Sequence, residues 1–171
     1  MGATVGKAFG IARAMKGGVG TASVSAGGFT VGALVAVNAI GDVLDAHNQV
    51  ISGVRSVDGS GLQQATASLI DGQRPAASHI APPGSATTIG VVATDANLTK
   101  AQATQLASLA HNGLARAISP ITQNDGDALF ALASGSNAHA ADLALLGTLA
   151  AEAVARAIRN AVLAAHGLPA P

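Results

Sequence analysis

Cysteine, tryptophan and tyrosine are all absent from this sequence, and phenylalanine occurs only three times in 171 residues. Without cysteine the chain can form no disulfide, offers no thiolate to a metal and has no thiol nucleophile. So few aromatic rings provide neither a platform for stacked bases nor an aromatic cage for a cation. Recognition by this chain must therefore use small side chains and the backbone.

An excess of charge of either sign is also missing. Lysine and arginine together number 9, as do aspartate and glutamate, so the formal net charge is zero. Such a chain produces no long-range field that attracts a polyanion or a membrane surface, and it lacks the electrostatic footprint of a nucleic-acid-binding domain. We therefore expect neither nucleic acid nor a membrane among its partners.

Long apolar runs are missing as well. No segment contains the roughly 20 consecutive apolar residues of a membrane span. Glycines interrupt the N-terminal sequence MGATVGKAFG, which is unlike a signal peptide. These features predict a cytoplasmic protein. The length suits one domain, and the many alanines and 21 glycines favour packing by close approach of backbones.

The first half of the chain contains two extended patterns and a hairpin. Residues 19–26 and 29–39 are predicted to be strands joined by a tight turn at a glycine pair. A shorter hairpin is expected at 41–54. The following excursion, 55–86, is poor in large apolar residues and rich in glycine and proline, and we expect it on the surface with a short helix at 61–70.

The second half alternates between strand and helix. β-Branched residues predict a strand at 87–94. A helix is predicted to begin at Thr99, because this residue and Gln102 have the spacing of a capping box. A strand at 128–133 and a long helix at 140–165 complete the order strand, helix, strand, helix.

A glycine-rich sequence and the histidines suggest a phosphate site and a metal site, but the residue spacing supports neither. The sequence KGGVGT, from Lys16 to Thr21, is similar to a phosphate-binding loop but lacks the lysine directly before the threonine. We interpret it as a glycine-rich turn at which backbones pack closely. The histidines stand singly, and none has a histidine partner at the spacing of a zinc site. No metal or other cofactor is expected.

Two carboxylates flank a glycine at Asp125, Gly126 and Asp127, in a loop before a predicted strand. The residues alone are compatible with a metal site, a tight turn or a contact with an amine. A metal would need more oxygen ligands than the neighbouring Asn124 supplies. A simple turn before the strand remains an equal alternative.

A pair of threonines, Thr87 and Thr88, opens a predicted strand directly after the loop sequence PPGSA. A threonine hydroxyl is a weak nucleophile, and its own α-amine can activate it when the threonine is the first residue of a chain. That amine has a pKa of about 8 and can accept the hydroxyl proton near neutral pH. An exposed loop before a strand-initial threonine is the layout of a self-cleaving precursor, although an ordinary loop can also end in threonine.

Several long segments, in a consistent order, carry a family resemblance. They are GATVGK, AMKGGVGTASV, VGALVAVNAIGDV, TTIGVVATDANLTKAQATQLASLAHNGLARAISP and NDGDALFALASG. They resemble the autoprocessing aminopeptidases and amidases that include the L-aminopeptidase/D-amino-acid amidase, β-aminopeptidases and nylon-oligomer hydrolases. The resemblance covers residues 2–135, with a variable part at 55–82. It implies an α/β fold, the αββα sandwich of the N-terminal-nucleophile-hydrolase type.

The resemblance also implies a precursor that cuts itself before a serine or threonine, which then becomes the nucleophile. In this sequence the nucleophile would be Thr87 and the broken bond Ala86-Thr87, giving fragments 1–86 and 87–171. Family members often have asparagine before the nucleophile, and others have glycine. Because the attack needs only the carbonyl group of the preceding residue, Ala86 is compatible with cleavage.

The remaining family positions fall on polar residues of this chain. Asn38 matches the asparagine that supports the oxyanion, and Asp125 and Asp127 match the pair that orients the nucleophile and its free amine. The family lysine falls on Lys7 by spacing, with Lys16 as the alternative. The resemblance implies no metal and no cofactor.

Relatives carry a long region before the segment that matches GATVGK, whereas Met1 directly precedes it here. We therefore expect residues 1–171 to form a single partial domain, incomplete at its N-terminus. The resemblance implies a homo-oligomer acting on small peptides or amides with a free amine. It leaves open α-amino amides, β-peptides and ω-amino oligoamides. The alternative is an inactive family remnant with a structural or interaction role.

Overall fold

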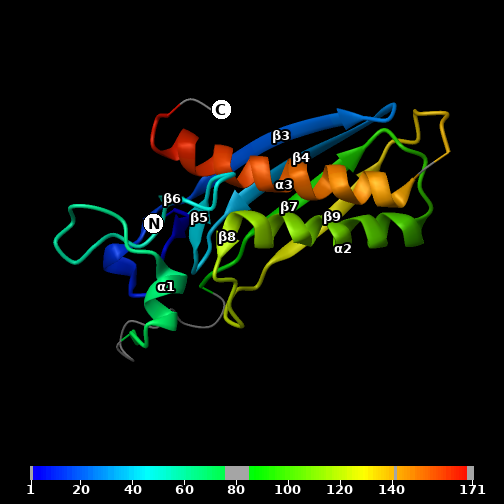
Figure 1. Ribbon diagram of the computed structural model, residues 1–171. Helices are drawn as coiled ribbons and strands as arrows, with labels where there is room; N and C mark the ends of the chain where they lie inside the picture. The colour runs from blue at the N-terminus through cyan, green and yellow to red at the C-terminus, as the bar shows by residue number, and fades with distance from the viewer. Residues whose placement is uncertain (1, 76–84, 141, 169–171) are drawn as a thin grey trace.

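The chain is described by a computed structural model that covers residues 2–75, 85–140 and 142–168 (Figure 1). The loop directly before Ser85 lies outside the described residues. In chain order, the elements are β1 (Thr4–Val5), the short 3-10 helix η1 (Ile11–Arg13), β2 (Met15–Lys16), β3 (Gly18–Ala26), β4 (Phe29–Val37), β5 (Asp42–Leu44), β6 (Val50–Ser52), α1 (Ala65–Ile70), β7 (Ile89–Thr94), α2 (Lys100–Ala117), β8 (Ile118–Ser119), β9 (Ala128–Ala133) and α3 (Leu143–Ala165).

The main sheet has the strand order β3-β4-β7-β9. Strands β3 and β4 form the predicted antiparallel hairpin, with Ala26 opposite Phe29 at its turn. Strand β7 is antiparallel to β4, whereas β9 is parallel to β7. As a result, the end of β4 and the starts of β7 and β9 meet at the same edge of the sheet. In Figure 1 these strands lie behind the two long helices.

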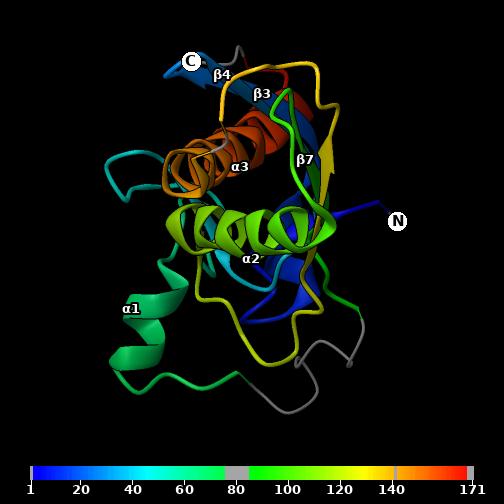
Figure 2. The same cartoon turned by 90° about the vertical axis from the view of Figure 1, so that its right-hand side faces the viewer.

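Helices α2 and α3 cover one face of the main sheet (Figure 2). Alternate residues of β4 point toward the helices and are buried, among them Val31 and Val35. The residues between them are more exposed, so β4 is a central strand with one buried face. The other sheet face, which we call the open face, carries the exposed side chains Val19, Leu34, Ile89, Phe130 and Leu132.

The glycines of the segment similar to a phosphate loop allow β3 to approach α3. A Cβ atom added to Gly20 would lie 2.1 Å from the backbone oxygen of Ala157. The interpretation as a site of close backbone packing is thus confirmed, although the segment is part of β2 and β3 rather than a turn. No helix in the described ranges is long and apolar enough to cross a membrane.

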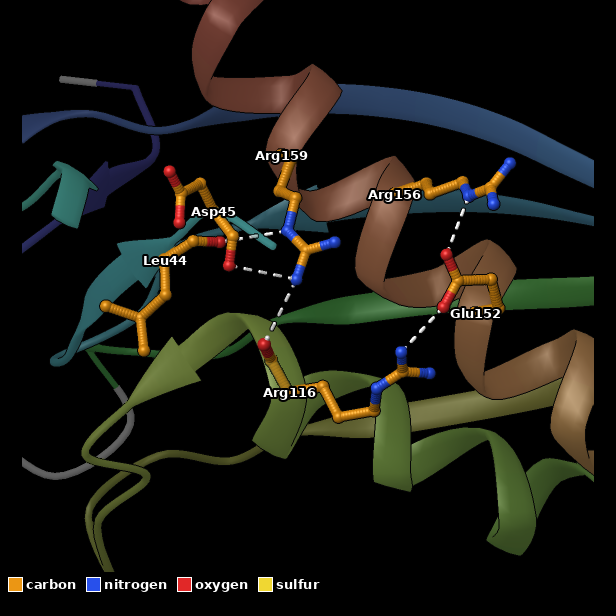
Figure 3. Close-up of polar contacts among 6 residues, drawn as sticks. All are labelled: Leu44, Asp45, Arg116, Glu152, Arg156 and Arg159. Atoms are coloured by element: carbon orange, nitrogen blue, oxygen red, sulfur yellow. Dashed lines mark hydrogen bonds and ion pairs between the residues drawn. The ribbon is translucent and has the colours of Figure 1, made fainter. Parts of the chain in front are cut away.

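Arginine side chains fasten α3 to its neighbours (Figure 3). The guanidinium of Arg159 donates to the backbone oxygens of Leu44 at 2.9 Å, Asp45 at 3.2 Å and Arg116 at 3.3 Å. Glu152 pairs with Arg116 at 2.7 Å and with a second arginine one turn along α3. These contacts hold α3 against β5 and the C-terminal end of α2.

A smaller sheet with the order β6-β5-β8 lies beside the main sheet and contains the hairpin predicted at 41–54. Its buried Asp42 accepts hydrogen bonds from the N–H groups of Val54 at 2.8 Å and Ala65 at 2.7 Å. The second bond fixes the start of α1. Burial raises the pKa of Asp42 to about 6, against the opposing effect of the two hydrogen bonds.

Candidate active site

The residues expected in the site converge at one edge of the main sheet. Asn38 follows β4, Ala86 and Thr87 precede β7, and the aspartate pair precedes β9. The strand directions described above require these segments to meet. Lys7 follows β1 and is buried in the same cluster, whereas Lys16 lies exposed in β2. Of the two candidate lysines, only Lys7 contacts the other expected site residues.

Backbone hydrogen bonds hold the peptide between Ala86 and Thr87 from both sides. The N–H of Thr87 donates to the backbone oxygen of Asn38 at 2.9 Å. On the other side, the N–H of Gly126 donates to the carbonyl oxygen of Ala86, also at 2.9 Å. Ala86 further forms a parallel bridge with Asp125. This peptide is therefore fixed between the end of β4 and the loop that precedes β9.

The hydroxyl of Thr87 lies beside the carbonyl group that precedes it. Thr87 Oγ1 donates to the oxygen of Ala86 at 2.7 Å. Ala86 is fully buried, and Thr87 is half-buried. A Cβ atom added to Gly126 would lie 2.9 Å from Thr87 Oγ1, so the hydroxyl occupies space that a side chain at position 126 would crowd.

The ammonium of Lys7 faces three oxygens. Its Nζ atom lies 2.7 Å from Asn38 Oδ1, 3.2 Å from the backbone oxygen of Asn38 and 3.3 Å from that of Ser85. Three acceptors match the three donors of a protonated lysine. Burial lowers the pKa of Lys7, and the charge of Asp125 acts in the opposite direction.

The side-chain amide of Asn38 connects three segments. Its Oδ1 atom accepts from Lys7 Nζ and from the N–H of Thr4 at 3.1 Å, while its Nδ2 atom donates to the oxygen of Ser85 at 3.2 Å. The amide of Asn38 therefore binds the carbonyl one residue before Ala86.

The two aspartates contact different parts of the site. Asp125 accepts from the N–H of Ile40 at 3.0 Å and from both the N–H and the hydroxyl of Thr122, at 2.9 and 2.8 Å. Asp127 accepts from the N–H of Thr88 at 2.7 Å. Burial raises the pKa of Asp127, and the nearby negative charge of Asp125 raises it further. The hydrogen bond from the N–H of Thr88 acts in the opposite direction.

Two features of the site have no signal in the sequence. The first is the hydrogen bond from Gly126, because nothing in the pattern Asp-Gly-Asp specifies which carbonyl group its N–H faces. The second is Thr88, whose side chain is fully buried and whose hydroxyl has no hydrogen-bond partner among the described residues. The described ranges also contain no group of three or more histidine, cysteine or acidic side chains placed to hold a metal ion.

Comparison with known proteins identifies the family. The family model of peptidase family S58 matches residues 1–171. The chain belongs to peptidase family S58. An uncharacterized aminopeptidase of Mycobacterium leprae is 40% identical over 183 residues, covering 98% of this chain and 49% of the relative. An uncharacterized aminopeptidase of Mycobacterium tuberculosis is 37% identical over 182 residues, covering 92% and 52%. This S58 chain spans about half the length of the curated relatives it matches.

Solved structures agree with the family assignment. The β-aminopeptidase of Burkholderia sp. matches this S58 chain with a TM-score of 0.55 and 32% identity, over 94% of this chain and 44% of that one. The L-aminopeptidase D-Ala-esterase/amidase of Ochrobactrum anthropi matches with a TM-score of 0.52 and 26% identity, over 92% and 41%. The latter is described as a variant of the Ntn hydrolase fold. The predicted α/β fold of the N-terminal-nucleophile-hydrolase type is confirmed.

Proposed function

We propose that this S58 chain is the nucleophile-bearing part of a self-cleaving amidohydrolase with aminopeptidase activity, and that Thr87 is its nucleophile. The observation that carries the proposal is the 2.7 Å contact between Thr87 Oγ1 and the oxygen of Ala86. The hydroxyl lies beside the carbonyl group that it would attack. The backbone bonds on both sides of the peptide fix this arrangement, and positioning of this kind lowers the barrier of a reaction.

Self-cleavage would begin with attack of Thr87 Oγ1 on the carbonyl carbon of Ala86. The C–N bond to Thr87 then breaks, and the proton from the hydroxyl passes to the departing nitrogen. This step leaves an ester between Ala86 and Thr87 Oγ1. Water hydrolyses the ester to a carboxylate on Ala86, and Thr87 regains its hydroxyl and carries a free α-amine.

The new α-amine would form at a defined place. The nitrogen of Thr87 already lies 2.9 Å from the backbone oxygen of Asn38, which can accept a hydrogen bond from the amine as it does from the amide. An α-amine with a pKa of about 8 is partly unprotonated near neutral pH. It can then take the proton of Thr87 Oγ1 as the hydroxyl attacks an amide substrate to form an acyl-enzyme.

Cleavage would also release two polar groups for the substrate. Lys7 and Asn38 both contact the oxygen of Ser85 in the precursor, and that oxygen belongs to the fragment that ends at Ala86. Once this end moves away, Asn38 Nδ2 becomes available to the oxyanion of a substrate. We assign to Asp125 and Asp127 the orientation of Thr87 and its amine, because both hold backbone groups next to the cleavage point.

The substrates proposed are small peptides or amides with a free amine. Two structural relatives are named as aminopeptidases, and one of these is also named as an esterase and amidase. We further propose a homo-oligomeric, cytoplasmic enzyme.

Intact-mass measurement tests the proposal directly. We expect the purified chain, incubated at neutral pH, to yield fragments 1–86 and 87–171. Thr87→Ser should still cleave, whereas Thr87→Ala should remain intact. The adjacent Thr88→Val is the matched control and should cleave. Release of p-nitroaniline from L-alanyl and β-alanyl p-nitroanilides should follow the fraction cleaved.

Other outcomes would favour the alternative of an inactive remnant. The proposal fails if the unaltered chain stays intact, or if Thr87→Ala cleaves at the same bond. If the chain cleaves but hydrolyses neither anilide, self-cleavage is supported and these two compounds are excluded as substrates.

A further inference from the structure

The loop between Asp125 and Asp127 places a backbone donor against the bond proposed to break. We propose that the N–H of Gly126 is the oxyanion donor of self-cleavage, stabilising the charge that develops on the oxygen of Ala86. This inference rests on the proposed function. It adds a catalytic group that makes contact with a reacting atom.

The hydrogen bonds at the oxygen of Ala86 identify this donor. Among the described residues, two donors reach that oxygen: Thr87 Oγ1 at 2.7 Å and the N–H of Gly126 at 2.9 Å. The hydroxyl gives up its proton when Oγ1 attacks, so it cannot remain a donor to the developing oxyanion. The N–H of Gly126 retains its hydrogen throughout the reaction and is therefore the donor that persists.

The other candidate donors point elsewhere. Asn38 Nδ2 and Lys7 Nζ both donate to the oxygen of Ser85, one residue before the carbonyl under attack. The asparagine that the family resemblance links to the oxyanion therefore does not contact the oxygen of Ala86 in the precursor. We assign the two oxyanions to different donors: Gly126 serves self-cleavage, and Asn38 serves the later substrate.

Neighbouring contacts hold the N–H of Gly126 in place before the reaction. The carboxylate of Asp125 is bound by the N–H of Ile40 and by two groups of Thr122. The carboxylate of Asp127 is bound by the N–H of Thr88. A donor fixed in this way needs no reorganisation when charge develops, which is the property that makes oxyanion donors effective.

The absence of a side chain at position 126 supports the role of Gly126 independently of the hydrogen bonds. A Cβ atom there would lie 2.9 Å from Thr87 Oγ1 and 3.8 Å from the oxygen of Ala86. Gly126 has no positive φ angle, so backbone strain does not account for glycine at this position. The glycine instead provides the space that the nucleophile occupies beside its donor.

Replacement of the Gly126 amide by an ester tests the inference. Incorporation of glycolic acid at position 126 removes the N–H and adds no side chain. We expect the first-order rate of self-cleavage to fall by about 10²- to 10³-fold, the usual effect of removing one oxyanion donor. The matched control is an ester at Gly135, whose N–H donates to the oxygen of Ala96 at 3.3 Å, away from the site. Its cleavage rate should be unchanged.

A measurement on the all-amide chain covers the case in which the ester at position 126 prevents folding. In the cleavage-deficient Thr87→Ala variant, NMR should detect a through-hydrogen-bond coupling between the nitrogen of Gly126 and the carbonyl carbon of Ala86. Gly126→Ala should also slow cleavage by crowding Oγ1. The control Gly32→Ala should cleave normally, because its added Cβ meets its nearest atom at 3.9 Å.

The outcomes separate this inference from the proposed function. A folded chain with the ester at position 126 that cleaves as fast as the parent would overturn the role of Gly126 and leave Thr87 as the nucleophile. Absence of the NMR coupling would overturn it as well. If the parent chain itself does not cleave, the proposed function fails first, and the role of Gly126 fails with it.

Discussion

The ammonium of Lys7 lies 2.7 Å from the side-chain oxygen of Asn38 in a buried position. The same ammonium also reaches the backbone oxygens of Asn38 and Ser85, so one charge joins the segment after β1, the end of β4 and the segment before β7. Burial of a charge is costly unless its hydrogen bonds are satisfied. The three acceptors satisfy the hydrogen bonds of the Lys7 ammonium and fix its position next to the proposed cleavage point.

Lys7→Met should therefore slow self-cleavage and destabilise the chain. Removal of the ammonium leaves partly buried oxygens of Asn38 and Ser85 without this donor, a change that typically costs about 1–3 kcal/mol. We expect at least a ten-fold slower appearance of the 87–171 fragment and a lower urea midpoint. Lys16→Met is the control, because this lysine is exposed in β2. Equal effects of the two substitutions would contradict the assignment of Lys7.

Two substitutions at Asp127 should separate hydrogen bonding from charge. Asp127→Ala removes the acceptor for the N–H of Thr88, whereas Asp127→Asn retains an oxygen for this bond and removes the charge. We expect the alanine variant to be less stable by about 1–3 kcal/mol and the asparagine variant to lie near the parent in urea unfolding. If positioning of Thr88 is what self-cleavage requires, the asparagine variant should also process faster than the alanine variant. Equal rates would exclude that role.

Local chemistry made several elements predictable from the sequence. The capping box of Thr99 and Gln102 forms as expected and begins α2. The long helix predicted from residue 140 instead begins at Leu143, because the side chain of Asp142 caps it by accepting from two N–H groups of its first turn. The patterns of β-branched and apolar residues also located β9 at its predicted bounds and β7, which begins at Ile89, two residues after the predicted start at Thr87.

Contacts between distant segments were not predictable in the same way. The sequence grouped Thr87 with the aspartate pair through a family resemblance, but the register that sets Ala86 beside Asp125 depends on two segments nearly forty residues apart. Likewise, the apolar residues of β9 predict a strand without indicating that Phe130 and Leu132 are exposed. Whether an apolar face is covered depends on the neighbouring layers and not on the strand itself.

Thr88→Val tests the buried hydroxyl next to the proposed nucleophile, Thr87. The side chain of Thr88 is fully buried and its hydroxyl lacks a hydrogen-bond partner among the described residues. Burial of an unpaired hydroxyl costs about 1–3 kcal/mol, so an apolar group of the same shape should raise stability by up to this amount. We expect a higher urea midpoint and unchanged self-cleavage. A loss of stability would show that the hydroxyl has a partner in solution.

The buried Asp42 should give the chain a distinctive pH dependence of stability. Burial raises its pKa from 3.8 to about 6, so the folded chain binds a proton here more readily than the unfolded chain. The stability contributed by protonation is fully present below pH 3.8 and is lost as the pH rises through 6. The loss amounts to about 3 kcal/mol, at roughly 1.4 kcal/mol for each pH unit.

Urea unfolding of Asp42→Asn between pH 4 and 7 measures this contribution as a difference from the parent. Asp127 has a raised pKa as well and affects both chains equally, so it cancels in the comparison. The variant should lose the decline assigned to Asp42. It should also be less stable at low pH, because its amide can accept from only one of the two N–H groups of Val54 and Ala65. Asp71→Asn, at an exposed position, is the matched control for a change from aspartate to asparagine. An Asp42→Asn profile parallel to that of the parent would show that this carboxyl titrates normally in the folded chain.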